Sequence, residues 1–96
     1  MANIRVTPEE LKTQGEDLKR YAEGLESILK EVDEKIGMID EGWDGLAQDA
    51  YLGMYQEMKK SLDEFPKLVD SIGDATVGAA NAFAQVDEEL QRGFSS

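Results

Sequence analysis

Apolar residues recur along the first half of the chain with the spacing of an α-helix. Steps of four and three residues keep them on one side of a helix. The members of this seam are Leu11, Gly15, Leu18, Ala22, Leu25, Leu29, Val32, Ile36 and Ile39. Thr7-Pro8-Glu9-Glu10 supplies a start, because threonine caps, proline fits the first helical position and glutamate completes a capping box. The pattern predicts a helix over about residues 8–40, with Gly24 and Gly37 as places of close helix approach.

A second run with the same spacing predicts a second helix over about residues 46–90. Its members are Tyr51, Tyr55, Met58, Leu62, Phe65, Val69, Ile72, Thr76, Ala79, Phe83, Val86 and Leu90. We expect this whole run to form the core seam. Pro66 removes an amide and costs about 3 kcal/mol in a helix interior. Because the seam resumes in phase after Pro66, we expect a kink there and not a helix end.

The stretch Glu41-Gly42-Trp43-Asp44-Gly45 separates the two runs and predicts the tip of a helical hairpin. Glycine takes positive φ at little cost, and Asp44 can cap the second helix. Trp43 can close the tip by burying its ring against both arms, and we favour a partly buried ring that also forms half of a recognition surface. We therefore expect one all-α domain over 1–96: helix 8–40, a turn 41–45 built on Trp43, Asp44 and Gly45, helix 46–90 and tail 91–96.

The apolar stripe on each predicted helix is too wide for one partner helix to cover. Tyr21 and Ile28 widen the first stripe, and Met54 and Leu68 widen the second. A monomer would leave more apolar surface exposed than is usual. We expect two hairpins, each of two long antiparallel helices, to pair antiparallel as a four-helix bundle, with these four residues in the dimer interface.

Composition limits the partners of the chain. Its 96 residues include 21 acidic and 10 basic side chains, giving a net charge of −11, and they lack cysteine and histidine. Nucleic acid and anionic membranes repel such a chain, so we expect neither as a partner. Disulfides, typical zinc sites and the commonest catalytic base are missing. The first ten residues lack the apolar stretch of a signal peptide, and no apolar run approaches the ~20 residues of a membrane span, so we expect no stable membrane insertion.

Clustered acids suggest two further chemistries, and the sequence favours neither. The possible calcium ligands lack the spacing of a calcium loop, so a solvated helix face is the better interpretation. They are Glu31, Asp33, Glu34, Asp40 and Glu41. Asp63 and Glu64 could perform acid–base catalysis, but two helices offer no evident cleft to shift a pKa. We predict no catalytic residue, no metal site and no cofactor.

The end of the second helix carries a pattern of its own. If the chain folds back at residue 43, the numbers of opposite residues add up to about 86, and Pro8 lies opposite residue 78. The seam from Ala79 to Leu90 then overhangs the first helix by about 18 Å. Phe83, Asp87 and Leu90 fall along one side of that overhang and form a charged and apolar patch that a partner could recognise.

Two motifs resemble the WXG family of early-secretory-antigen-like proteins. One is Trp43-Asp44-Gly45 at mid-chain between two long heptad helices. The other is Phe83-x-x-x-Asp87-x-x-Leu90-x-x-x-Phe94, which is similar to the family's export signature of bulky residue, acid and bulky residue. Phe83 stands where the commonly quoted short form has tyrosine. Together the motifs span the chain.

The resemblance implies a bacterial protein that is made in the cytoplasm and secreted without a signal peptide by the type VII (ESX) pathway. It also implies export as a folded homodimer or with a WXG paralogue, recognition by a membrane translocase ATPase, and action as an effector or virulence factor. We favour self-pairing, because one chain carries both motifs. The alternative is an intracellular adaptor or chaperone that escorts a larger type VII toxin. A structural coiled-coil module would leave the tail pattern unexplained.

Overall fold

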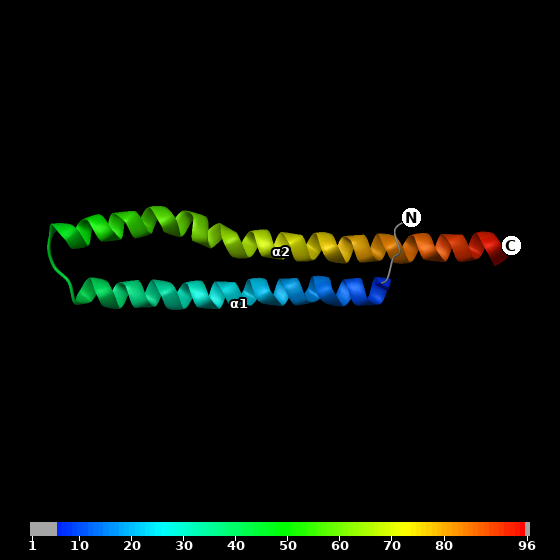
Figure 1. The fold of residues 1–96 in the computed structure, drawn as a ribbon, viewed down its shortest axis with the longest axis horizontal. Coiled ribbons are helices and arrows are strands. Elements are labelled where there is room, and N and C mark those ends of the chain that lie inside the picture. Colours follow the sequence, from blue (N-terminus) through cyan, green and yellow to red (C-terminus); the bar gives the residue numbers. More distant parts are fainter. Residues whose placement is uncertain (1–5, 96) are drawn as a thin grey trace.

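A computed structural model describes residues 6–95 of the chain as two long helices joined by a short turn. Helix α1 spans Pro8–Glu41 and helix α2 spans Leu46–Ser95. They run antiparallel and form a hairpin with extents of 77 × 20 × 18 Å (Figure 1). The predicted all-α hairpin is confirmed. Helix α2 continues beyond residue 90, where the sequence predicted a tail; residue 96 and the side chain of Phe94 lie outside the described residues.

Thr7 caps α1 as the sequence predicts. Its hydroxyl oxygen accepts a hydrogen bond from the Glu10 amide at 3.1 Å, and the Glu10 carboxylate accepts one from the Thr7 amide at 3.4 Å. Pro8 occupies the first helical position. Both amides would otherwise lack a partner within the helix, so the capping box is confirmed.

The turn uses only one of its two glycines for a special backbone conformation. Gly45 has a φ of 117°, the one positive φ among the described residues, whereas Gly42 ends α1 at a φ of −94°. The Gly45 carbonyl accepts a hydrogen bond from the Asp49 amide at 3.2 Å, so Gly45 is the residue that precedes α2. The expected capping of α2 by Asp44 is therefore wrong, because Asp44 comes one residue too early.

The helices touch backbone to backbone at Gly15 and Gly73. A β-carbon added to Gly73 would lie 2.9 Å from the Gly15 carbonyl oxygen and 2.6 Å from Cγ of Lys19. The Nζ of Lys19 lies 2.7 Å from Oδ1 of Asp74 beside this contact. The hydrogen bond to Asp74 and its negative charge raise the pKa of Lys19. Only glycine leaves room for so close an approach.

Gly24 and Gly37 do not have the role expected of them. A β-carbon added to either residue would meet nothing within 4 Å, so neither allows close approach in the hairpin. The two glycines that do so, Gly15 and Gly73, both lie at positions that face the other helix. The prediction for Gly24 and Gly37 is wrong because glycine content alone does not say which face a residue occupies.

Helix α1 turns its predicted seam toward α2. Of this seam, Gly15 and Ala22 are buried, Ile39 is 38% exposed, and the others are half-buried. These half-buried residues are Leu11, Leu18, Leu25, Leu29, Val32 and Ile36. The heptad pattern therefore predicted the inward face of α1.

Helix α2 turns a different set of residues inward than its pattern predicted. Tyr55 is buried and Val69 and Thr76 are half-buried, as expected. Other seam members are exposed: Met58, Leu62, Phe65, Ile72, Ala79, Val86 and Leu90. The residues that follow several of them point inward instead: Lys59, Pro66, Gly73 and Ala80. The close approach at Gly73 leaves no room for a side chain at this position, and the neighbouring Ile72 lies outside.

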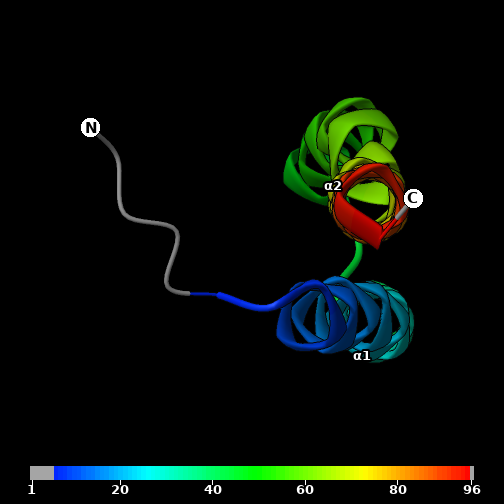
Figure 2. The ribbon, with the colours of Figure 1, turned by 90° about the vertical axis from the view of Figure 1, so that its right-hand side faces the viewer.

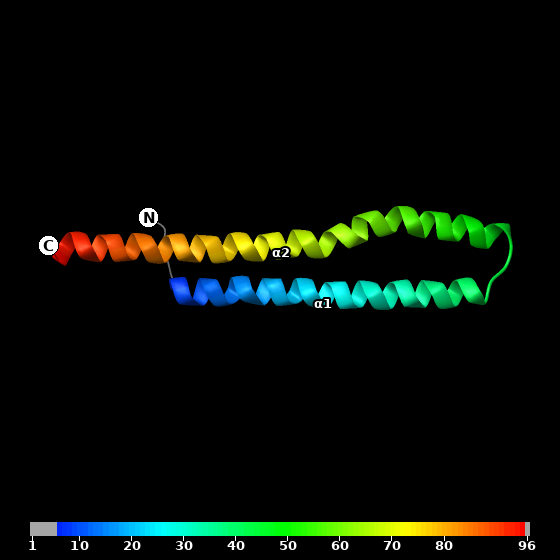
Figure 3. The ribbon, with the colours of Figure 1, turned by 180° about the vertical axis from the view of Figure 1, so that it is seen from behind.

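Helix α2 bends between its green and yellow parts, in the stretch that contains Pro66 (Figures 1 and 3). Figure 2, which looks along the hairpin, shows the green first half of α2 displaced from its red end. Proline has no amide hydrogen and crowds the carbonyl of the residue four positions earlier, which bends a helix. The predicted kink is confirmed.

Two contacts establish the register of the helices. Gly15 lies against Gly73, and the Tyr55 hydroxyl donates a hydrogen bond to Oδ1 of Asp33 at 3.0 Å. The residue numbers of both pairs add up to 88, so Pro8 lies opposite residue 80 and not residue 78. The part of α2 after residue 80 extends past the start of α1 (Figure 1). At 1.5 Å per residue, this overhang is about 22 Å long.

The Gly15–Gly73 contact predicts opposite effects of the same substitution at two glycines of α2. Gly73→Ala should lower the free energy of unfolding by about 1–3 kcal/mol, because the β-carbon forces the helices apart. Gly78→Ala should raise it by up to about 1 kcal/mol, because nothing lies within 4 Å and alanine favours the helix. Urea denaturation followed by circular dichroism measures both. Equal effects would contradict the proposed backbone contact.

Candidate interaction surface

Large apolar side chains line the outside of α2. Each of them is between 53% and 59% exposed: Met54, Met58, Phe65, Leu68, Ile72, Val86 and Leu90. On α1, Tyr21 and Ile28 are exposed to a similar degree. Single exposed apolar residues are common on proteins. The five from Met54 to Ile72 instead form a row along one side of α2, which indicates a surface that another molecule covers.

Tyr21 and Ile28 lie on the same side of the hairpin as the row on α2. On α1, Lys19 and Asp33 follow positions that face α2 and pair with Asp74 and Lys59, whereas Tyr21 and Ile28 precede such positions. Lys19 and Asp33 therefore lie on one flank of α1, and Tyr21 and Ile28 lie on the opposite flank. On α2, the row likewise precedes the inward positions. Because the helices are antiparallel, residues that precede the inward positions of both helices share one side of the hairpin.

We call this side the apolar face. It consists of Tyr21, Ile28, Met54, Met58, Phe65, Leu68 and Ile72. It includes the four residues that the sequence assigned to a dimer interface, and also Met58, Phe65 and Ile72, which the sequence assigned to the core. Gly73 is the sequence signal that could have distinguished core residues from residues of the apolar face. If Gly73 faces the other helix, its neighbour Ile72 cannot.

Trp43 lies at the hairpin tip with its ring only partly covered. Its centroid is 5.5 Å from that of Tyr51, with the two rings tilted by 53°, and the residue is 38% exposed. Leu46, the first residue of α2, is 88% exposed, and Met38 is exposed as well. The side-chain amide of Gln48 donates hydrogen bonds to the side chain and the carbonyl of Asp40 and so joins the two arms here. The tip thus presents apolar surface next to the turn motif Trp43, Asp44 and Gly45.

The overhanging end of α2 carries the proposed export residues. Ala80 is almost fully buried and is the last buried residue of α2 up to residue 93. Beyond it, Phe83 is half-buried, and Asp87 and Leu90 are exposed. Positions 83, 87 and 90 share one side of the helix by their spacing.

Comparison with known proteins matches nearly the whole chain to one family. The family described as "Proteins of 100 residues with WXG" matches residues 3–88. The chain belongs to this WXG100 family. Among its relatives, the ESAT-6-like protein of Streptococcus agalactiae is 27% identical over 90 residues, which cover 94% of each chain. The type VII secretion system extracellular protein A of Staphylococcus aureus is 23% identical over 94 residues, which cover 98% of this chain and 97% of the relative.

A solved structure confirms the fold of this WXG100 protein. The EsxA structure of Geobacillus thermodenitrificans superposes with a TM-score of 0.79 at 21% identity, covering 93% of this chain and 97% of the other. At this identity the likeness shows the fold. The resemblance inferred from the sequence motifs is therefore confirmed for the family and for the hairpin. Within residues 6–95, neither helix of this WXG100 chain is apolar enough over a sufficient length to cross a membrane.

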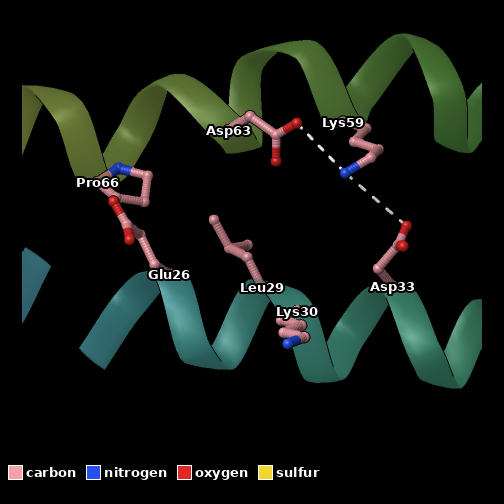
Figure 4. Close-up of a pocket in the computed structure, with 7 residues that line it drawn as sticks. All are labelled: Glu26, Leu29, Lys30, Asp33, Lys59, Asp63 and Pro66. Carbon is pink, nitrogen blue, oxygen red and sulfur yellow. Dashed lines mark hydrogen bonds and ion pairs between the residues drawn. The ribbon is translucent and has the colours of Figure 1, made fainter. Parts of the chain in front are cut away.

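A groove opens between the arms of the WXG100 hairpin where α2 bends. Its volume is about 320 Å³. It is lined by Glu26, Leu29, Lys30 and Asp33 of α1 and by Lys59, Asp63 and Pro66 of α2. Figure 4 shows Glu26 and Leu29 pointing from α1 toward α2. Sequence reasoning found no evident cleft, because the pattern does not say how far a proline bend separates two helices.

Polar contacts join the arms beside this groove. Lys59 Nζ lies 3.3 Å from Oδ2 of Asp63 and 3.8 Å from Oδ1 of Asp33 (Figure 4). The hydrogen bond to Asp63 and the charge of Asp33 raise the pKa of Lys59. Burial and the hydrogen bond to Asp33 raise the pKa of the Tyr55 hydroxyl. The apolar pattern of the sequence does not reveal this network, because Lys59 is a charged residue at a position that faces the other helix.

The acidic residues considered for catalysis and metal binding are separated in the hairpin. Asp63 pairs with Lys59, whereas Glu64 pairs with Lys67 at 3.4 Å. These two carboxylates therefore do not share a site. Nor does the described part of the chain bring together three acidic side chains in a group that could hold a metal ion.

The partial exposure of Trp43 predicts a modest effect of its removal. Trp43→Ala should lower the free energy of unfolding by about 1–2 kcal/mol, less than the roughly 3–5 kcal/mol of a buried aromatic residue, because part of the ring is already in water. Leu46→Ala is the matched control and should leave stability nearly unchanged. Chemical denaturation measures both. A loss above about 4 kcal/mol for Trp43→Ala would mean that the ring is a core residue.

Proposed function

We propose that this WXG100 protein is a secreted interaction protein of a type VII secretion pathway and acts as a dimer of hairpins. The observation that carries the proposal is the apolar face, which needs a partner, on a chain whose relatives include a type VII secretion system extracellular protein. Its partners are a second copy or a WXG paralogue, and the membrane ATPase of the pathway. After export, it acts as an effector or virulence factor through its surface.

A second copy fits the apolar face better than an oppositely charged partner would. The seven residues of this face carry no charge, although the chain as a whole carries −11. Two copies can therefore bury the face against itself without placing like charges at its centre. Apolar burial contributes about 25 cal/mol per Å² and opposes the long-range repulsion between two acidic chains. An antiparallel pair of hairpins gives the four-helix bundle expected from the sequence.

A charge placed on the apolar face should prevent pairing. Leu68→Asp is expected to raise the dimer dissociation constant by about tenfold or more, because the dimer would bury an unpaired carboxylate. Ser71→Asp adds the same charge on the exposed back of α2 and should pair normally. Sedimentation at micromolar concentration measures the dissociation constants. A folded monomer of the unaltered protein, or equal effects of the two variants, would refute the dimer.

The overhang of α2 is the proposed export signal. Phe83, Asp87 and Leu90 lie on one side of the part of α2 that extends past the start of α1. Asp87 and Leu90 are exposed and Phe83 is half-buried, so a translocase can reach this side without unfolding the hairpin. Phe94 continues this spacing in the last turn of α2, and its side chain lies outside the described residues. A helix with apolar anchors at steps of three and four residues is a common form of peptide recognition.

Alanine substitutions on the two sides of the overhang test the export signal. The triple variant Phe83→Ala, Asp87→Ala and Leu90→Ala should stay folded and lose secretion, because it removes the proposed recognition surface and keeps the buried contacts of the hairpin up to Ala80. The control Asn81→Ala, Gln85→Ala and Glu89→Ala changes the opposite side, also removes one carboxylate, and should be secreted normally. Immunoblots of medium and cells measure export. Normal secretion of the first variant would refute the signal.

The same fractionation separates secretion from the alternative role of an intracellular escort. A secreted effector reaches the medium when no larger partner is expressed. An adaptor or chaperone for a type VII toxin would appear in the medium only together with that toxin, or would stay in the cell. The extended apolar face is compatible with both roles, so the cellular location decides between them.

A further inference from the structure

We propose that the groove at the bend of α2 binds an arginine side chain presented by a partner polypeptide. The groove lies between Glu26–Asp33 of α1 and Lys59–Pro66 of α2 and has a volume of about 320 Å³. This inference is independent of the proposed dimer and of the export signal. It assigns a second contact, of different chemistry, to the hairpin.

The charges around the groove favour a cation. Three carboxylates line it, those of Glu26, Asp33 and Asp63, against the two ammonium groups of Lys30 and Lys59. One negative charge therefore remains uncompensated, and a single guanidinium would neutralise the site. The net charge of −11 attracts a basic segment at long range for the same reason.

The carboxylates are not equally available to a partner. Asp33 and Asp63 already share Lys59 between them, and Asp33 also accepts the hydrogen bond from Tyr55. The Glu26 carboxylate makes no hydrogen bond or ion pair with the rest of the described chain. It points from α1 toward α2 (Figure 4). Glu26 is thus the carboxylate most able to accept a new donor.

The apolar walls of the groove suit arginine better than lysine. Leu29 and the ring of Pro66 supply hydrocarbon surface for the stem and the flat face of a guanidinium. A guanidinium offers five donors in one plane and can serve more than one carboxylate at once, whereas an ammonium group acts as a point charge.

The groove remains accessible when the apolar face is covered. Lys59, Asp63 and Asp33 lie on the flank of the hairpin that carries the cross-helix ion pairs, opposite the flank with Tyr21 and Ile28. A second hairpin on the apolar face would therefore leave the groove open to a third chain. One protein could hold its own copy on one side and a basic partner on the other.

Titration of the full-length, isotope-labelled protein with N-acetyl-arginine amide tests the proposal by nuclear magnetic resonance. N-acetyl-citrulline amide, which has nearly the same shape without the charge, is the control ligand. We expect saturable shifts of amide signals within residues 26–33 and 59–66 for the arginine compound alone. Glu26→Gln should weaken binding by about threefold or more, the size expected for loss of one partly exposed charge-assisted contact.

Glu23→Gln is the matched control, because it removes one exposed carboxylate of α1 outside the groove. It should leave the affinity unchanged. Similar weakening by both variants, shifts spread over acidic residues of the whole chain, equal binding of the citrulline compound, or no saturable shift would each overturn the proposal. The unperturbed signals of each variant's spectrum establish that it is folded. Since these readouts involve neither secretion nor pairing, they are independent of the proposed function.

Discussion

The backbone contact between Gly15 and Gly73 decides where the large side chains of this hairpin lie. Two helices that approach so closely leave no room for a side chain at the two glycines, and the buried residues on either side of the contact are Ala22 and Ala80. The bulky residues of α2, such as Phe65 and Ile72, therefore lie on the outside. The same contact that joins the two helices creates the apolar face that calls for another partner.

The sequence predicted the elements of the fold better than the faces of the helices. Heptad spacing, the capping residue Thr7 and the turn around Trp43 are local signals, and they predicted two helices and their connection. The direction in which α2 faces depends on a contact between residues far apart in the chain. The apolar stripe of α2 is wide enough to cover two sides of the helix, and the sequence does not say which side faces α1. For this reason the sequence places Phe65 in the core.

The candidate surfaces differ in how far the sequence could reveal them. Tyr21, Ile28, Met54 and Leu68 were found because an apolar residue beside a seam is visible in a heptad. The groove was not found, because it depends on how far Pro66 turns one arm from the other. Its polar residues look like an ordinary solvated helix face in the sequence. Only the register that places Asp33 opposite Tyr55 brings the carboxylates of both helices together.

The two halves of the hairpin are held together in different ways, and Pro66 marks the change. Toward the chain ends, glycine and alanine pack backbone against backbone. Toward the tip, α2 has bent away, and the arms are joined by Tyr55 and Lys59 on Asp33, by Gln48 on Asp40 and by the Trp43–Tyr51 contact. Solvent-exposed polar contacts stabilise a structure less than close packing does, so the tip half is the more easily opened. Proline costs about 3 kcal/mol inside a helix. Here Pro66 separates a half in which the helices pack backbone to backbone from a half joined mainly by polar contacts. The groove that we assign to a partner lies at the boundary between them.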